Sequence, residues 1–168
     1  MKFDLFATGC FDHLTTSFGI YDDPDLPEEP VKKVSYDEGV AKIENKNNRS
    51  IYFVPVDKNI ICYKPNSKDI ESQCDALLIC LRPQAIYDLY FVELKNVRKD
   101  WITDGIEQLK TSISNLTSVY SVACISKKMA FLANGKHPYY HFSLKEKMEK
   151  FRNETGFRLN ICAEITIK

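Results

Sequence analysis

The sequence predicts a single α/β (α+β) domain in which a central mixed β-sheet is flanked by helices. Short apolar runs rich in β-branched residues recur between polar turns through the middle of the 168-residue chain, which is typical of strands. One amphipathic stripe at helical spacing follows these runs, and a second, strongly charged helical pattern lies nearer to the last residue. A domain of this length buries roughly 68–70% of the surface that its unfolded chain exposes, so it can fold without cross-links.

Charge and cysteine usage exclude several classes of protein. The 23 lysines and arginines balance 23 aspartates and glutamates, whereas a protein that coats nucleic acid without sequence preference is usually strongly basic. The balance leaves room for a local basic groove. No C-x-x-C pair occurs among the six cysteines, and the three histidines do not pair with them at zinc spacing. We therefore expect reduced, buried thiols rather than a zinc or iron–sulfur site.

The same residues predict a protein without a membrane segment. No stretch approaches the roughly 18 apolar residues needed to span a bilayer. The first residues include Asp4 and Asp12 and lack a sustained apolar core, so they do not resemble a secretion signal. Together with the reduced thiols, this favours a cytoplasmic location.

The single domain, residues 1–168, is expected to have three parts. Residues 1–39 form an N-terminal extension with an acidic, proline-punctuated loop at 22–30. Residues 40–126 form the core, and residues 127–168 add a helix and a last strand at the C-terminal side.

Within the core, residues 40–43 and 51–56 are predicted to form a hairpin, and residues 60–63 a further short strand. The almost continuously apolar run 74–82 is typical of a strand that is buried on both faces. The run 89–96 returns beside it, so these two strands should form a central antiparallel hairpin.

The second half of the chain is predicted to alternate helices and strands. The helix that follows Asp100 has an apolar stripe that steps by three and four residues: Ile102, Ile106, Leu109, Ile113 and Leu116. A crossover should lead to a buried strand at 119–125. A charged helix is expected at 143–154, stopped by Gly156, and one last strand at 157–168.

Three ionisable residues at the ends of the central strands predict a metal site. Side chains alternate between the faces of a strand, so Glu93 and Lys95 share one face, and a hairpin in suitable register sets Asp75 beside Glu93. Two carboxylates are costly to bury unpaired, and a divalent cation removes that cost. Mg²⁺ or Mn²⁺ would take oxygen ligands from Asp75, Glu93 and the Leu94 carbonyl. Lys95 could then orient or deprotonate a metal-bound water.

The E-x-K triplet carries little information by itself. It occurs a second time as Glu44-Asn45-Lys46, in a segment that we interpret as a polar turn. The triplet at residues 93–95 differs from this second one because apolar strands and a helix surround it. The alternative is that Glu93 and Lys95 form an exposed ion pair, which contributes about 0–1 kcal/mol to stability.

Asp75, the triplet Glu93-Leu94-Lys95 and the helix that contains Gln108 resemble the PD-(D/E)XK nuclease superfamily, which includes restriction enzymes and Holliday-junction resolvases. The resemblance implies a restriction-endonuclease-like core: a helix, three antiparallel strands, a helix and a further strand. It also implies Mg²⁺-dependent phosphodiester hydrolysis, with Asp75 and Glu93 as metal ligands, Lys95 as the catalytic lysine and Gln108 close to the site.

The sequence departs from that family in three places. Cys74 stands where the family's name-giving proline would be, and Ser112 stands where one branch has a tyrosine. The first core helix, which often brings another acidic residue, has no clear counterpart. Glu38 is our candidate for that additional metal ligand, and Asp57 is a weaker one.

Five residues are expected to contact nucleic acid: Arg98, Lys99, Trp101, Lys127 and Lys128. If both basic clusters lie at one rim, they would bind phosphates in a salt-sensitive manner. Trp101 could stack on a base. The alternatives are solubilising surface charge and a tryptophan that seats the helix on the sheet.

The sequence thus predicts a small metal-dependent nuclease that acts on DNA rather than RNA. The alternative is a catalytically inactive protein of the same fold that serves as a protein-interaction or immunity-like module. The neutral charge and the acidic loop at 22–30 favour this alternative. A homodimer and a complex with a partner protein both stay open.

Overall fold

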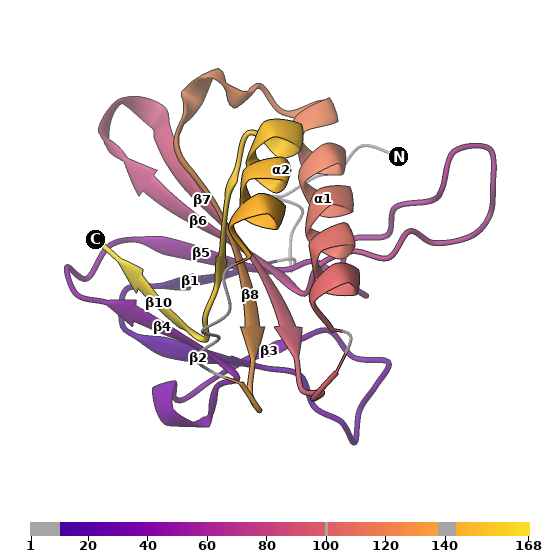
Figure 1. Cartoon of the computed structure of the whole chain (residues 1–168). Helices are drawn as coiled ribbons and strands as arrows, with labels where there is room; N and C mark the ends of the chain where they lie inside the picture. Colours follow the sequence, from indigo (N-terminus) through magenta and orange to yellow (C-terminus); the bar gives the residue numbers. More distant parts are fainter. Residues whose placement is uncertain (1–10, 100, 138–143) are drawn as a thin grey trace.

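The computed structural model describes residues 11–99, 101–137 and 144–168, which fold into three layers (Figure 1). A six-stranded sheet forms the middle layer. Two α-helices cover one of its faces, and a four-stranded sheet covers the other. The predicted mixed α+β class is confirmed, although helices flank only one face of the central sheet.

The central sheet has the strand order β1-β5-β6-β7-β8-β9. Neighbouring strands are antiparallel from β1 to β7, whereas β8 is parallel to β7 and β9 is parallel to β8. The sheet is therefore mixed, as predicted. Its strands are β1 (Asp12–Leu14), β5 (Ile51–Pro55), β6 (Ala76–Arg82), β7 (Ile86–Lys95), β8 (Ile125–Asn134) and β9 (Arg158–Ile161).

The second sheet has the order β10-β4-β2-β3. Its strands are β10 (Glu164–Ile167), β4 (Ala41–Asn45), β2 (Phe18–Tyr21) and β3 (Lys32–Val34). A short 3₁₀ helix, η1 (Tyr36–Glu38), joins β3 to β4. The segments expected as additions before and after the core thus supply strands to both sheets.

The two helices lie where the sequence predicts them. Helix α1 (Trp101–Val119) buries the predicted stripe against the central sheet, with Leu109, Ile113 and Leu116 almost inaccessible to solvent. Helix α2 (Lys145–Thr155) ends at Gly156, whose φ of 76° and backbone N–H bond to the Arg152 carbonyl oxygen form a left-handed cap.

Strands β6 and β7 separate two apolar cores. Leu77 and Phe91 face the helices, whereas Leu78 and Val92 face the second sheet. Because strand side chains alternate between faces, both strands are apolar on both sides, as predicted for the run 74–82. The predicted antiparallel hairpin is confirmed by the register that pairs Ala76 with Val92 and Arg82 with Ile86.

The predicted hairpin across residues 40–56 is wrong, because β4 and β5 belong to different sheets. The turn between them is held by the buried Asn45 side chain. Its amide oxygen accepts the Arg49 N–H at 2.9 Å, and its NH₂ group donates to the carbonyl oxygens of Thr15 and Arg49. These bonds turn the chain from one layer to the other.

Three further strand predictions need correction. Residues 60–63 form no strand, and only one bridge joins Tyr63 to Ile70. The strand expected at 119–125 begins at Ile125, because α1 runs on to Val119 and η3 (Val122–Cys124) follows it. The expected last strand splits into β9 and β10, which lie in different sheets.

In the described part of the chain, η1 is the only helical element that precedes β5. The helix that the nuclease resemblance places there is not found, and the second sheet covers that face of the central sheet instead. Neither described helix is long and apolar enough to be a candidate membrane span.

Candidate functional site

The site is built at the end of β7, where the central sheet meets the beginning of α1 (Figure 1). The last registered pair of β6 and β7 is Ala76 with Val92, so the next position along both strands sets Asp75 opposite Glu93. Leu77 and Phe91, two residues inward, face the helices. Asp75 and Glu93 therefore share the helix-covered face, and Lys95 follows on the same side.

Asp75 is fixed by the backbone of the neighbouring strand. Its Oδ2 accepts a hydrogen bond from the Leu94 N–H at 2.6 Å. Burial raises the pKa of Asp75 to about 6, an effect that this hydrogen bond and the charge of Lys95 partly oppose. The negative charges of Asp22 and Asp57 also raise the pKa of Asp75, which places both groups within electrostatic range of the site.

Glu93 is the most deeply buried charge of the site, with 1% of its surface exposed. Its Oε1 forms an ion pair with Lys95 Nζ at 2.6 Å, whereas the buried Oε2 has no hydrogen-bond partner among the described residues. Burial and then the charge of Asp75 raise the pKa of Glu93 well above its usual range, although Lys95 opposes this. A buried carboxylate oxygen without a partner is costly, so this atom is suited to a ligand.

Lys95 is held from two sides. In addition to Glu93, its ammonium group contacts Gln108 Oε1 on α1 at 2.5 Å, and the Gln108 NH₂ group donates to the Gln73 carbonyl oxygen at 3.2 Å. The glutamine thus links the lysine to the segment that leads into β6, and it fixes where the ammonium group lies.

Two residues that the sequence pattern does not assign to the site bring α1 close to it. Ser112 accepts the Cys74 N–H at 2.7 Å and donates its hydroxyl to the Gln108 carbonyl oxygen, which ties the helix to the start of β6. Gly105 lies against β7 and β8, and a Cβ atom there would be 2.5 Å from Leu132 Cδ1 and 3.4 Å from Glu93 Cγ. A larger residue at position 105 would push the helix away from Glu93.

A cavity of about 700 Å³ opens beside the site, and both Lys95 and Gln108 line it. Three carboxylates, Glu71, Asp104 and Glu107, also line this cavity. The lysine therefore has a route to solvent. Lys64 also lines the cavity, and Glu107 is paired with Lys110 at 2.9 Å, so the lining has only a small excess of negative charge.

Glu38, our candidate for an additional metal ligand, does not lie at the site. It belongs to η1, which packs on the second sheet, and its carboxylate accepts a hydrogen bond from the Ser35 hydroxyl at 2.6 Å. The weaker candidate, Asp57, lies nearer to the site. Its N–H donates to the Cys74 carbonyl oxygen, and its charge raises the pKa of both Asp75 and Glu93.

Trp101 is not available for stacking on a base. It is 4% exposed and belongs to the core between α1 and the central sheet. The indole therefore anchors the first turn of α1. Arg98 and Lys99 are exposed just after β7, where they could reach a ligand at the site.

Lys127 and Lys128 do not share a rim with the site. The parallel register pairs them with Asp88 and Leu89, near the start of β7, whereas Glu93 pairs with Leu132. At about 3.3 Å per residue, the five residues from Asp88 to Glu93 separate the two places by about 17 Å along the strand.

Asp75 and Glu93 supply part of a metal site. Within the residues that the structure describes, no group of three or more His, Cys, Asp or Glu side chains is arranged to hold a metal ion. Two carboxylates, one with an unpartnered buried oxygen, nevertheless fit a hard cation that keeps several waters as ligands.

Comparison of the chain with models of protein families, with curated proteins and with solved structures returns no match.

Proposed function

We propose that the protein hydrolyses phosphodiester bonds of nucleic acid, DNA rather than RNA, in a reaction that depends on Mg²⁺ or Mn²⁺. The observation that carries this proposal is the unpartnered, buried Oε2 of Glu93 on the same face as Asp75. A divalent cation would satisfy this oxygen and offset the cost of placing the buried carboxylate of Glu93 beside the partly buried carboxylate of Asp75.

The protein ligands would be Glu93, Asp75 and the Leu94 carbonyl oxygen. Asp75 uses one oxygen for the Leu94 N–H, which leaves the other for a cation. Because the N–H and C=O of one strand residue point toward the same neighbouring strand, the Leu94 carbonyl is directed to the side of Asp75. A cation bound there would polarise a phosphate group and lower the pKa of a bound water.

Lys95 would act beside these ligands. Glu93 and Gln108 hold its ammonium group at the end of the cavity, so the side chain needs little reordering before reaction. In this position it can orient the attacking water and offset negative charge that develops on the phosphate. Gln108 is then a positioning residue that acts through Lys95.

The order of elements also supports the proposal. Strands β5, β6 and β7 form an antiparallel run, α1 crosses over, and β8 lies parallel to β7. This is the succession that a restriction-endonuclease-like core would have after its first helix. The second sheet in place of that helix is a departure from the pattern.

A second candidate function is an inactive nuclease fold that serves as a protein-interaction module. Two observations favour it. Lys95 already neutralises Glu93 at 2.6 Å, so the charge of Glu93 is balanced without a cation. The cavity next to the lysine is also lined by three carboxylates against two lysines, an excess of negative charge that does not favour DNA. Under this alternative, a homodimer or a partner protein would use the surface around the cavity.

We also propose a cytoplasmic location. It is supported by the five cysteines that the structure describes, all of which are free thiols: Cys62, Cys74, Cys80, Cys124 and Cys162.

Incubation of the purified chain with branched, single-stranded and linear DNA, and with single-stranded RNA, tests the proposed function. We expect cleavage of at least one DNA substrate in Mg²⁺ or Mn²⁺ and none in EDTA. Calorimetric titration with Mn²⁺ separates the two candidates. Absence of both cleavage and millimolar Mn²⁺ binding would overturn the nuclease proposal and favour the inactive module.

A further inference from the structure

A second cavity lies at the opposite end of the central sheet from the candidate site. Strand β9 pairs with residues 129–132 of β8, and no strand among the described residues lies beside residues 125–128 on that side. A cavity of about 730 Å³ occupies this place, between the start of β8, the end of α2 and the end of β10. We call it the basic notch.

The charged side chains that line the basic notch are all positive. The described residues that line the basic notch include five cationic side chains and no aspartate or glutamate, and none of these cations forms an ion pair with a described side chain. The five are Lys127, Lys128, Arg152, Arg158 and Lys168. Since the whole chain has a formal net charge of zero, this cluster is a local concentration of positive charge.

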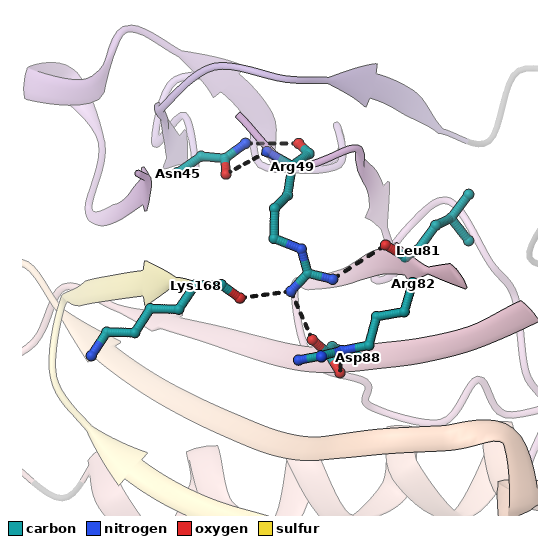
Figure 2. Close-up of polar contacts among 6 residues, drawn as sticks. All are labelled: Asn45, Arg49, Leu81, Arg82, Asp88 and Lys168. Carbon is teal, nitrogen blue, oxygen red and sulfur yellow. Dashed lines mark hydrogen bonds and ion pairs between the residues drawn. The ribbon is translucent and has the colours of Figure 1, made fainter. Parts of the chain in front are cut away.

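The carboxylate next to Lys127 in the sheet is already neutralised, as Figure 2 shows. The buried Asp88 accepts hydrogen bonds from Arg49 at 2.9 Å and from Arg82 at 2.7 Å. Two guanidinium groups share this carboxylate, so it is not free to pair with Lys127. Glu44, which accepts a hydrogen bond from Thr166 at the notch, is likewise paired with Lys46.

The same network fixes the shape of the notch. Arg49 also donates to the carbonyl oxygens of Lys168 at 2.7 Å and Leu81 at 3.2 Å, so it ties the end of the second sheet to β6 and β7 (Figure 2). The backbone of Lys168 at the wall of the notch is therefore held in place before any ligand binds, which lowers the entropic cost of binding.

The cations surround the free edge of β8 from both faces. Lys127 pairs with Asp88 and so lies on the face of the second sheet, whereas Lys128 lies on the helix face, where α2 brings Arg152. The apolar part of the lining comes from Met129, Tyr90 and Phe131, and the last two rings stack with centroids 6.2 Å apart.

We propose that the basic notch binds a phosphorylated ligand of nucleotide size. Lysine and arginine side chains are the usual partners of phosphate oxygens, and the fork of an arginine can bind two of them at once. The volume lies within the range of about 300–1,000 Å³ that is common for small-molecule sites. Of the apolar side chains that line the notch, Met129 is partly exposed and offers a contact for a base, whereas Tyr90 and Phe131 are buried and form the floor beneath it.

This proposal goes beyond the proposed nuclease function and is independent of it. Lys127 in the basic notch pairs with Asp88, about 17 Å along β7 from Glu93, and the cations of the notch include no residue of the candidate site. Two sources would supply the same chemistry: a free nucleotide, or the phosphorylated end of a nucleic-acid strand.

Calorimetric titrations in EDTA and at low salt test the proposal. The probes are adenosine diphosphate, a short oligodeoxynucleotide with and without a 5′-phosphate, and a polyglutamate peptide. The test variant is Lys128→Glu/Arg158→Glu, and the control is Lys33→Glu/Lys68→Glu. Each pair makes the same change in net charge, and Lys33 and Lys68 are exposed and do not line the notch.

We expect saturable binding of adenosine diphosphate or of the 5′-phosphorylated oligonucleotide, and the tighter of the two identifies the source. The test variant should weaken that binding at least about 10-fold, and the control less than about 2-fold, since only the former removes charges in contact with the phosphate. If the test variant fails to fold, Lys128→Gln/Arg158→Gln replaces it, with Lys33→Gln/Lys68→Gln as control.

Three results would overturn the proposal. They are the absence of saturable binding of either phosphorylated probe, equal weakening by the test and control variants, and binding of polyglutamate in preference to both phosphorylated probes. The last result would assign the free edge of β8 to an acidic protein segment that adds a strand to the sheet.

Discussion

Glu93→Gln is expected to lower the rate of DNA cleavage at least about 1,000-fold, a loss of about 4 kcal/mol of transition-state stabilisation. The amide keeps the size of the side chain and can still accept the hydrogen bond from Lys95. It removes the negative charge that would hold the cation, however. Because the charge is lost without a cavity, the free energy of unfolding should stay within about 1 kcal/mol of the wild-type value. Single-turnover cleavage assays and thermal denaturation measure the two effects.

The chain contains its own matched control. Glu44 belongs to the second E-x-K triplet, is partly exposed on the second sheet, and forms an ion pair with Lys46 at 3.3 Å. Glu44→Gln should cleave DNA at the wild-type rate. If Glu93→Gln also cleaves within 10-fold of the wild-type rate, Glu93 is not a metal ligand and the proposed mechanism fails.

Lys95→Met is expected to lower the free energy of unfolding by about 3–5 kcal/mol at pH 8, because it leaves the buried carboxylate of Glu93 without its counter-charge. The loss should shrink as the pH falls. Burial already raises the pKa of Glu93 well above its usual range, and removal of Lys95 would raise this pKa further. Ionisation of Glu93 then opposes folding, so the penalty is present at alkaline pH and disappears near pH 4, where the carboxyl is protonated in both states.

Urea denaturation of wild type and Lys95→Met at pH 5 and pH 8 measures this effect. Lys46→Met is the control, since its ion pair with Glu44 is exposed and contributes about 0–1 kcal/mol. The double variant Glu93→Gln/Lys95→Met should recover most of the lost stability. An equal loss at both pH values would show that Lys95 acts through packing rather than through its charge.

The centre of the fold was predictable from local patterns in the sequence. Continuous apolar runs produce β6 and β7, which are buried on both faces, and the helical stripe produces α1. The alternation of side chains between the two faces of these strands was enough to place Asp75, Glu93 and Lys95 on one face. Because Glu93 and Lys95 share one face of the strand, their ion pair was predictable. The burial of this pair beneath α1 depends on helix packing that the sequence does not reveal.

Pairing between distant segments could not be predicted. Strand β10 lies parallel to β4, and the Arg49 side chain reaches the carbonyl oxygen of Lys168, although more than 100 residues separate these partners. Such contacts are decided by how layers pack, not by local propensity. For the same reason the sequence predicted Lys127 at the rim of the candidate site, which is wrong. It also could not decide whether Trp101 stacks on a base or packs between α1 and the sheet.

Asp57 illustrates the same limit within the site. No local pattern in the sequence sets Asp57 beside Asp75, and only the pairing of residues 56–57 with residues 74–75 brings it near that residue. Glu38 was the stronger candidate of the two, but it lies on the second sheet, where its carboxylate accepts a hydrogen bond from the Ser35 hydroxyl.

The location of bound Mn²⁺ tests the central claim most directly. Crystals soaked in Mn²⁺ should give an anomalous difference peak that bridges the carboxylates of Asp75 and Glu93, within coordination distance of the Leu94 carbonyl oxygen. The absence of a peak between these two carboxylates at saturating Mn²⁺, or Mn²⁺ bound only elsewhere on the protein, would contradict the account.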